Sequence, residues 1–590
     1  MPLHRLAAAM LGVAILSPAP GASALALEVA GAPTPAQLIG QKLMVAMSGT
    51  TPTASILGRI QRGEVGGVIL FGANISSAVQ LAALTAKLRQ AAAQGGQPPL
   101  LIATDQEGGS IKRLSWAAPT LSPPSMGVSG STTTAFAQGK ATGIGLECAG
   151  INNDLAPVAD VPSSTSSFMY QQGRTWSFSA STTAALSDAF ASGLEAGNAV
   201  PTMKHFPGIG RATLNTDSYV VTITASASTL ASGLLSYQKA IANHIPMIML
   251  SNATYTAYDS ANAAGWSHAV NTDLLRTSLG FTGVTITDSL TGTAESRGVT
   301  PTSLAIKAAK AGTDMLMLTG SESSTASTYS ALVSAAQAGS ISATRLQASY
   351  SRILALKAAL PAPTADTSPP TQHAPVSRLY GLATLGTTTE ATTPVRTSWS
   401  ASDGCGISHY TLERRVSGGA WTVQSTPGLA TSLTQSLSFG STYRYAAKAT
   451  DGAGNTSSVV EGAAFEPALA QQTSTAITYH GTWTPVANAY ASGGSLRYST
   501  AAGASATYTF TGTSVSWVAY RGANRGKAAV YVDGAYEATI DLYSSVYWAR
   551  QIVYAASWPT SGTHTLKIVN LGTAGHSRVD VDAFVRLIAR

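Results

Sequence analysis

Charged residues stand at the ends of several short apolar stretches of the 590-residue chain, and their types suggest one polar site. Asp105 follows LLIAT, Lys204 and His205 lie in MKHFPG, Arg174 lies in GRTWSF, and Asp288 ends TITD. Carboxylates and basic groups that converge can bind a hydroxyl-rich ligand and stabilise charge that develops during a reaction. Each residue alone could instead be a buried, hydrogen-bonded residue that holds a loop. Together they favour a functional site.

Eight short apolar stretches are predicted to be the strands that position these residues. Each is apolar on consecutive positions and ends in glycine or polar residues, as buried parallel strands do. Periodic helical segments lie between them, for example at 76–94 and 228–245. This alternation predicts an α/β fold, a (β/α)8 barrel over residues 27–360, with its site at the carboxyl ends of the strands. The predicted strands lie within 42–47, 66–72, 99–105, 150–160, 200–206, 245–251, 283–288 and 313–319.

The remainder of the chain is predicted to be all-β. Residues 361–375 are rich in proline and are expected to form a semi-rigid linker. Short alternating stretches and a DGAGN turn predict a β-sandwich of fibronectin type III or immunoglobulin-like kind at 376–467. A second β-sandwich is predicted at 468–590.

That last segment holds 16 of the 41 aromatic residues of the chain. The enrichment has two explanations. Tyrosine and tryptophan favour strands and could simply pack the core. Alternatively, the segment is a carbohydrate-binding module in which sugar rings stack on Trp517, Tyr520, Tyr547 or Trp548.

The amino terminus is typical of a secretory signal peptide. A short basic start precedes the apolar stretch 7–17, and small residues follow at 22–26, which predicts cleavage near residue 26 and a secreted protein. The alternative, an anchor helix, is disfavoured because the apolar stretch is shorter than the roughly 20 residues that span a bilayer. No later segment is long and apolar enough to insert stably into a membrane.

Composition restricts the partners further. The net charge of +7 is small for this length and no run of Lys or Arg accompanies it, so nucleic-acid binding is not expected. Cys148 and Cys405 fit neither a disulfide framework nor a zinc motif, and we expect two isolated thiols in separate domains. No metal or other cofactor is expected, and the sequence leaves the oligomeric state open.

Five motifs give the chain a family resemblance. GGVILFGANI (66–75), IATDQEGGSIKRL (102–114), INNDLAPVADV (151–161), KHFPGIG (204–210) and FTGVTITDSL (281–290) occur in this order. With them, residues from about 35 to 360 resemble the family 3 glycoside hydrolases, specifically the compact bacterial β-N-acetylglucosaminidases. The resemblance implies a carbohydrate substrate, hydrolysed with Asp288 as nucleophile.

The resemblance also implies roles for the other polar residues. Asp105 matches the acceptor of sugar hydroxyl groups, and Arg113, Arg174, Lys204 and His205 match substrate contacts.

The acid/base position departs from the family pattern. This branch usually supplies a histidine in an Asp-Ser-His sequence, whereas the present chain has Asp217-Ser218-Tyr219. A tyrosine titrates near 10 and is a poor general base at neutral pH. We therefore predict that Asp217 is the acid/base, as carboxylic acids are in most glycosidases, and that Tyr219 positions the loop or the sugar. The alternative is that Asp217 only caps a loop.

The sequence is compatible with three functions. The favoured one is a secreted, retaining exo-glycosidase that removes terminal β-linked N-acetylhexosamine from cell-wall or chitin-derived glycans. The second is a β-glucosidase or other β-glycosidase with the same site. The third is a sugar-binding barrel without catalysis, which the departure at Tyr219 would favour and the full set of sugar contacts disfavours.

Overall fold

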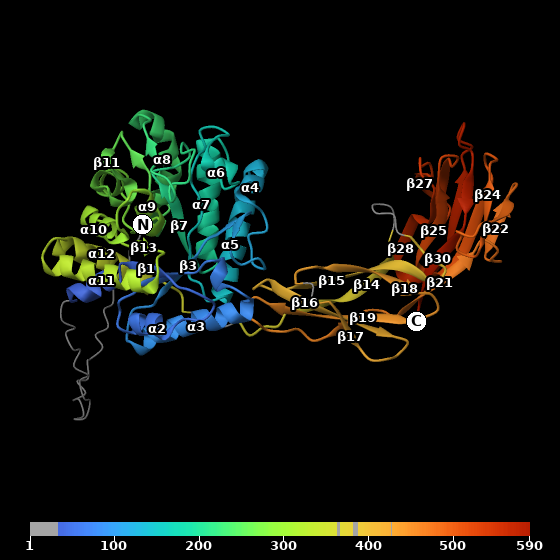
Figure 1. The fold of residues 1–590 in the computed structure, drawn as a ribbon, viewed down its shortest axis with the longest axis horizontal. Helices are drawn as coiled ribbons and strands as arrows, with labels where there is room; N and C mark the ends of the chain where they lie inside the picture. Colours follow the sequence, from blue (N-terminus) through green and yellow to red (C-terminus); the bar gives the residue numbers. More distant parts are fainter. Residues whose placement is uncertain (1–32, 363–365, 381–386, 426–427) are drawn as a thin grey trace, which may run out of the picture.

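A computed structural model describes residues 33–362, 366–380, 387–425 and 428–590 of the chain. Figure 1 shows a barrel surrounded by helices at one end of an elongated molecule, followed by two β-rich regions that extend away from it. The predicted signal peptide at 1–26 lies outside the described residues. Among the described helices, none has the length and apolar character that a bilayer-spanning segment requires.

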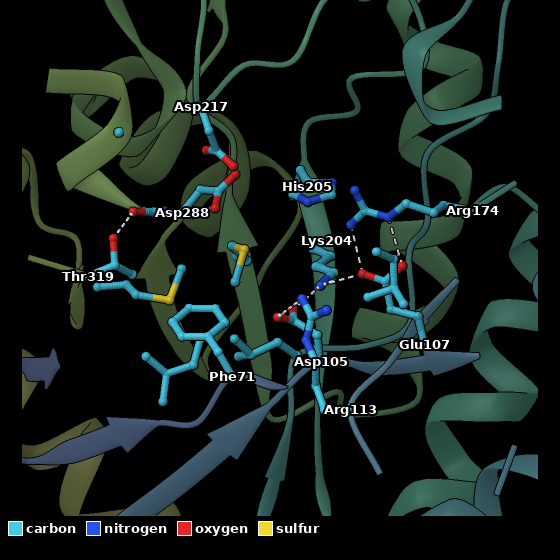
Figure 2. A pocket seen from close by; sticks show the side chains of 17 residues that line it. Phe71, Asp105, Glu107, Arg113, Arg174, Lys204, His205, Asp217, Asp288 and Thr319 are labelled. Carbon is cyan, nitrogen blue, oxygen red and sulfur yellow. Dashed lines mark hydrogen bonds and ion pairs between the residues drawn. The ribbon is translucent and has the colours of Figure 1, made fainter. Parts of the chain in front are cut away.

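The barrel is built from eight parallel strands in the order β12-β9-β7-β6-β3-β2-β1-β13. The first and last strands of this sheet also touch, through a parallel bridge between Ile286 and Met315, so that the barrel is nearly closed. The predicted (β/α)8 fold is confirmed, and the carboxyl ends of the strands surround the pocket of Figure 2. The strands are β1 (Leu43–Ala46), β2 (Gly67–Ile69), β3 (Leu101–Thr104), β6 (Asn153–Asp154), β7 (Val200–Phe206), β9 (Met247–Leu250), β12 (Val284–Thr287) and β13 (Leu316–Leu318).

Local sequence explains why the helices begin where they do and how they pack. Ser77 caps α3 by accepting a hydrogen bond from the backbone N–H of Gln80 at 3.1 Å. Helices α5 and α7 pack closely because Gly139 has no side chain: a Cβ there would collide with the carbonyl oxygen of Phe190. The barrel helices are α1 (Pro35–Gly40), α2 (Ala54–Gln61), α3 (Ala78–Gln94), α4 (Pro123–Ser129), α5 (Thr132–Cys148), α6 (Phe168–Gln171), α7 (Ala180–Ala196), α8 (Ala227–Ala242), a π-helix (Ala269–Ser278), α9 (Leu290–Ser296), α10 (Pro301–Ala311), α11 (Glu322–Gln337) and α12 (Ala343–Ala358).

The β-rich part of the chain divides differently from the predicted boundaries. Strand β14 (Thr371–Leu379) begins inside the range predicted as linker, and β21 (Phe465–Gln471) crosses the predicted boundary at 467/468. One sheet has the order β14-β15-β18, and a long sheet has the order β17-β16-β19-β21-β30-β25-β28-β26-β27. The remaining strands in these two orders are β15 (Thr392–Ser402), β16 (Ile407–Val416), β17 (Thr422–Ser425), β18 (Ser432–Ser438), β19 (Tyr443–Asp451), β25 (Ser505–Arg521), β26 (Lys527–Val532), β27 (Ala535–Asp541), β28 (Trp548–Asn570) and β30 (Ala583–Ala589).

The two β-rich regions share a core. Strand β21 pairs with β30 over its whole length, from Phe465 opposite Ala589 to Gln471 opposite Ala583. Buried Trp399 and Leu412 of the first region belong to the same apolar cluster as Val518 and Leu587 of the second. The regions are therefore packed as one body rather than joined by a flexible tether.

The aromatic residues proposed for sugar stacking have different environments. Trp517 and Tyr520 are buried in the core, so the prediction that sugars stack on these two rings is wrong. Tyr547 and Trp548 are exposed. Both faces of β25 are buried over residues 514–520, and aromatic enrichment in the sequence does not show that a strand is covered on both faces.

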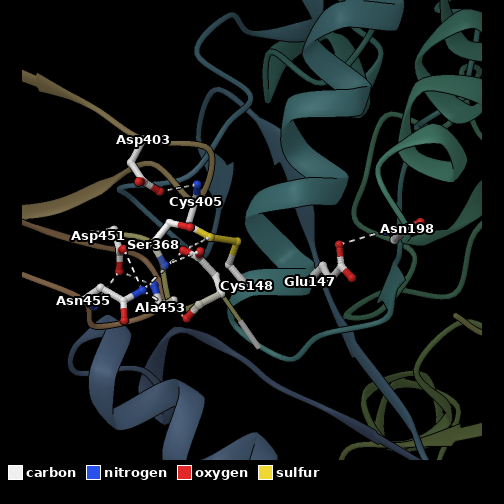
Figure 3. Close-up of a disulfide and its surroundings, with 10 residues drawn as sticks. Glu147, Cys148, Asn198, Ser368, Asp403, Cys405, Asp451, Ala453 and Asn455 are labelled. Atoms are coloured by element: carbon white, nitrogen blue, oxygen red, sulfur yellow. Dashed lines mark hydrogen bonds between the residues drawn. A yellow bond between two sulfur atoms is a disulfide. The ribbon is translucent and has the colours of Figure 1, made fainter. Parts of the chain in front are cut away.

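The prediction of two isolated thiols is wrong, because Cys148 and Cys405 form a disulfide (Figure 3). Cys148 is the last residue of α5, and Cys405 lies in the loop between β15 and β16, so the bond joins the barrel to the first β-rich region. Their Cα atoms are 5.6 Å apart although 257 positions separate them in sequence. Only the tertiary arrangement of the two domains brings them together.

Candidate active site

A cavity of about 380 Å³ lies at the carboxyl ends of the barrel strands (Figure 2). It collects seven of the eight residues predicted for the site: Asp105, Arg113, Arg174, Lys204, His205, Asp217 and Asp288. An apolar wall faces them, made of Ile69, Phe71, Leu155, Met249 and Met317. Polar groups opposite an apolar wall suit a sugar, which has hydroxyl groups at its edge and C–H groups on its faces.

One side of the cavity is a buried network of charges. The ammonium group of Lys204, which lies on β7, is 2.7 Å from Oδ1 of Asp105 and 2.7 Å from Oε1 of Glu107. Arg174 donates two hydrogen bonds to the Glu107 carboxylate, at 2.8 and 2.7 Å. Arg113 lies 3.4 Å from the second oxygen of Asp105. Three cations therefore surround two carboxylates, which leaves one net positive charge at this side of the cavity.

The network is fixed in its charged form at neutral pH. Burial alone would favour neutral carboxyl groups, but Arg174 and Lys204 outweigh it and lower the pKa of Glu107 to about 2. Burial likewise opposes the charge of Lys204, yet the carboxylates of Asp105 and Glu107 raise the pKa of its ammonium group. The Asp105 carboxylate, paired with two cations, keeps acceptor capacity for a ligand.

Asp288 lies across the cavity, directly after β12. Its backbone N–H donates to the carbonyl oxygen of Leu250 on the neighbouring strand, and one carboxylate oxygen accepts a 2.7 Å hydrogen bond from the backbone N–H of Ser289. The residue is 8% exposed and lines the cavity. The barrel thus holds this carboxylate rigidly and leaves it accessible.

Asp217 reaches the same cavity from the loop that follows β7. The loop is fixed beyond Asp217, since β8 (Thr222–Ile223) pairs with β10 (Thr254–Tyr255). Asn252, which follows β9, donates a 3.0 Å hydrogen bond from Nδ2 to Oδ1 of Asp217 and a 3.1 Å bond to the carbonyl oxygen of Ser289. Figure 2 shows the carboxyl groups of Asp217 and Asp288 side by side.

This environment changes how Asp217 titrates. Burial and the negative charge of Asp288 raise the pKa of Asp217 to about 7, although the hydrogen bond from Asn252 acts in the opposite direction. A carboxyl group with such a pKa exists in both protonation states near neutral pH. It can therefore donate a proton and take one back.

His205 is oriented by a buried carboxylate. Its Nδ1 lies 2.7 Å from Oδ2 of Asp160, and the other oxygen of this carboxylate, Oδ1, accepts a 2.7 Å hydrogen bond from the backbone N–H of Ile209. Because a carboxylate can only accept, Nδ1 carries the proton. Asp160 thereby fixes both the imidazole ring and the turn that follows β7.

The sequence profile described as "Glycosyl hydrolase family 3 N terminal domain" matches residues 37–356, more than half of the chain. The chain belongs to glycosyl hydrolase family 3. It is therefore a glycoside hydrolase, and the family resemblance expected from the five sequence motifs is confirmed.

Relatives of this family 3 hydrolase include proteins from fungi and bacteria. It is 34% identical over 332 residues to an uncharacterised secreted glycosyl hydrolase of Arthroderma benhamiae, an alignment that covers 55% of this chain and 93% of the relative. It is 32% identical over 286 residues to a β-hexosaminidase of Nitrosomonas eutropha, covering 47% of this chain and 80% of the relative.

Solved structures similar to this chain include an N-acetylglucosaminidase and an N-acetylhexosaminidase. The family 3 β-N-acetylglucosaminidase from Paenibacillus sp. has a TM-score of 0.54 and 29% identity, over 57% of this chain and 65% of that one, slightly under two thirds of its length. The β-N-acetylhexosaminidase from Beutenbergia cavernae has a TM-score of 0.52 and 31% identity, over 55% of this chain and 99% of that one.

The family 3 site differs from the sequence-based prediction in a few residues. Tyr219 does not line the cavity and is 53% exposed. Glu107, Asp160 and Asn252 were not predicted, although they hold Arg174, His205 and Asp217 in place. Asn252 stands immediately after the predicted strand at 245–251, so its position at a strand end was the feature that could have identified it.

Proposed function

We propose that this glycoside hydrolase is a retaining exo-glycosidase that removes terminal β-linked N-acetylhexosamine. The observation that carries the proposal is the pair of carboxyl groups, Asp288 and Asp217, in one cavity beside a cationic network. Two carboxyl groups with different titration behaviour are what a two-step displacement requires.

In the first step, Asp288 attacks the anomeric carbon. A bond forms between this carbon and a carboxylate oxygen, the bond to the glycosidic oxygen breaks, and the protonated Asp217 gives its proton to the leaving oxygen. In the second step, Asp217, now a carboxylate, takes a proton from water while the water oxygen attacks the anomeric carbon and Asp288 leaves. Two displacements restore the β configuration.

The charged network binds and orients the sugar in this mechanism. Asp105 accepts hydrogen bonds from sugar hydroxyl groups, while Lys204, Arg113 and His205 lie around the same cavity and are the proposed substrate contacts. Arg174 lines the same cavity, and its guanidinium also holds the Glu107 carboxylate through two hydrogen bonds.

The substrate class is supported by relatives. The Nitrosomonas protein is a β-hexosaminidase and the Paenibacillus structure is a β-N-acetylglucosaminidase, so we propose N-acetylglucosamine-containing glycans of cell walls or chitin as substrates. We also propose that the protein is secreted. The disulfide between Cys148 and Cys405 supports this, since such bonds persist in oxidising compartments.

A direct comparison of two substrates tests the proposal. The full chain is assayed on the nitrophenyl β-glycosides of N-acetylglucosamine and of glucose, with Asp288→Asn as the background control. We expect a clear preference for the N-acetylated substrate and loss of turnover in the variant, because an amide cannot form the glycosyl ester. Preference for the glucoside would indicate a β-glucosidase. Hydrolysis of neither, or activity of Asp288→Asn within about tenfold of wild type, would overturn the proposed mechanism.

A further inference from the structure

The terminal β region presents an aromatic surface that the barrel chemistry does not use. Tyr543, Tyr547 and Trp548 are 45%, 57% and 50% exposed, and all three belong to residues 542–548, which we call the aromatic loop. The loop connects β27 to β28. Three large rings half-exposed within six residues mark a binding surface rather than a core.

The protein holds these rings in place. Gly522 lies directly against the Tyr547 ring, which a Cβ at this position would penetrate. The guanidinium of Arg525 lies 5.3 Å from the centre of the same ring, and the Tyr547 hydroxyl donates to Oδ1 of Asn524 at 3.4 Å. Trp548 is the β-sheet partner of Arg521. Tyr547 is therefore held by its neighbours while more than half of its surface stays exposed, and Trp548 is fixed through the backbone of the sheet.

The backbone of the loop is equally well anchored. Leu542 is fully buried, its N–H donates to the carbonyl oxygen of Gly526, and its carbonyl oxygen accepts from the N–H of Gly522, both at 3.1 Å. Arg521 donates a 3.0 Å hydrogen bond to the carbonyl oxygen of Tyr543. A rigid aromatic surface loses little conformational entropy when a ligand binds.

We infer that the aromatic loop binds a β-linked polysaccharide, with the faces of successive pyranose rings packed on Tyr547 and Trp548. The C–H groups on the face of a pyranose ring match a flat aromatic ring in shape and polarity. Side chains with hydrogen-bonding groups border the rings: Arg521, Asn524 and His576, whose ring lies 4.9 Å from that of Tyr543. They can bind the hydroxyl groups at the sugar edge.

The position of the aromatic loop indicates that it holds the enzyme on its polysaccharide substrate and takes no part in bond cleavage. Figure 1 shows the terminal β region at the opposite end of the long axis from the barrel. The two β-rich regions share a core, and a disulfide joins the first of them to the barrel. The connection between the barrel cavity and the aromatic loop is therefore rigid. A bound polysaccharide raises the concentration of chain ends near the barrel without altering the chemistry.

The test compares two variants of the full chain. Tyr547→Ala/Trp548→Ala removes both rings of the aromatic loop. Tyr536→Ala is the matched control: Tyr536 is 58% exposed and lies near the start of β27, roughly 17 Å along the strand from its end at Asp541. Retention on insoluble chitin and on peptidoglycan is measured in separate arms, which distinguish the two sources of N-acetylated glycan. Thermal unfolding is recorded for each protein.

We expect the double variant to lose at least about tenfold in retention on one or both polysaccharides, with the rate on a soluble nitrophenyl glycoside within about twofold of wild type. Tyr536→Ala should match wild type in both assays, and Trp548→Phe, which keeps a ring, should regain most of the retention. Wild-type retention by the double variant, equal loss in Tyr536→Ala, or no binding by the wild type would overturn the inference. The same pull-down with Asp288→Asn separates binding from turnover: this variant should bind like wild type without hydrolysing substrate, whereas wild-type binding together with near wild-type hydrolysis would contradict only the proposed function.

Discussion

The hydrogen bond from Asn252 to Asp217 provides a quantitative test of the acid/base assignment. Asn252 is fully buried, and its amide nitrogen lies 3.0 Å from Oδ1 of Asp217. This bond stabilises the carboxylate and so lowers the pKa of Asp217, against burial and the charge of Asp288. Asn252→Ala removes the donor, and the pKa of Asp217 must therefore rise.

The size of the shift follows from the strength of the bond. A hydrogen bond to a charged group contributes about 1.5–3 kcal/mol, and about 1.4 kcal/mol corresponds to one pKa unit. Because Asp217 is only partly buried, we take the lower end and expect a rise of about one unit from the present value of about 7.

The assay is the pH dependence of kcat/KM on a substrate with a poor leaving group. In the proposed mechanism Asp217 must be protonated in the first step, so kcat/KM is expected to fall as the pH rises through its pKa. In Asn252→Ala this basic limb should move upward by about one unit. In Tyr219→Phe, which alters a residue outside the cavity, it should not move. An unchanged or lowered limb in Asn252→Ala would refute the assignment of Asp217, even if the maximal rate falls because the loop is less well held.

Three further perturbations test other parts of the account. Asp217→Ala should lower the rate on natural disaccharides more than the rate on substrates with good leaving groups. Added azide should partly restore turnover, because an anionic nucleophile needs no general base. Equal loss of rate on both kinds of substrate, without rescue by azide, would exclude Asp217 as the acid/base. Glu107→Gln should lower the free energy of unfolding by about 3–5 kcal/mol in a denaturant titration, because Arg174 and Lys204 lose a buried partner, and a loss below about 1 kcal/mol would contradict this. Since the pKa of Glu107 is about 2, the wild-type stabilisation should be complete above the ordinary carboxyl pKa of about 4.5 and be lost as the pH falls toward 2. Cys148→Ser should leave the rate on small substrates within about twofold but increase proteolysis near residues 361–370, and equal protease resistance would show that the disulfide does not hold the domains together.

The barrel could be predicted because parallel strands buried on both faces appear as short apolar stretches. Asp105 and Asp288 were predictable for a related reason, since each directly follows such a stretch and the strand ends of a barrel meet at one mouth. Residues that act by holding other side chains through tertiary contacts could not be predicted. Glu107 and Asp160 stand in motifs that were singled out, but only the folded chain shows that they hold Arg174 and His205.

The β-rich half was harder to predict in detail. Trp517 lies in a part of β25 that is buried on both faces, whereas Trp548 is the exposed first residue of β28, and aromatic enrichment alone could not distinguish the two positions. The predicted boundary between the two β regions falls inside β21, which pairs with the last strand of the chain, and no local sequence feature marks a pairing that distant. The disulfide could not be predicted for the same reason, since its cysteines come together only when the barrel and the first β-rich region pack against each other.

The proposed mechanism requires that Asp288 forms a covalent bond with the sugar. Incubation with a fluorinated N-acetylglucosaminyl fluoride, followed by protease digestion and mass spectrometry, should reveal a glycosyl adduct on the peptide that contains Asp288, and NMR should show the β anomer as the first product of a normal substrate. An adduct on a different residue, or an α anomer as the first product, would contradict the account.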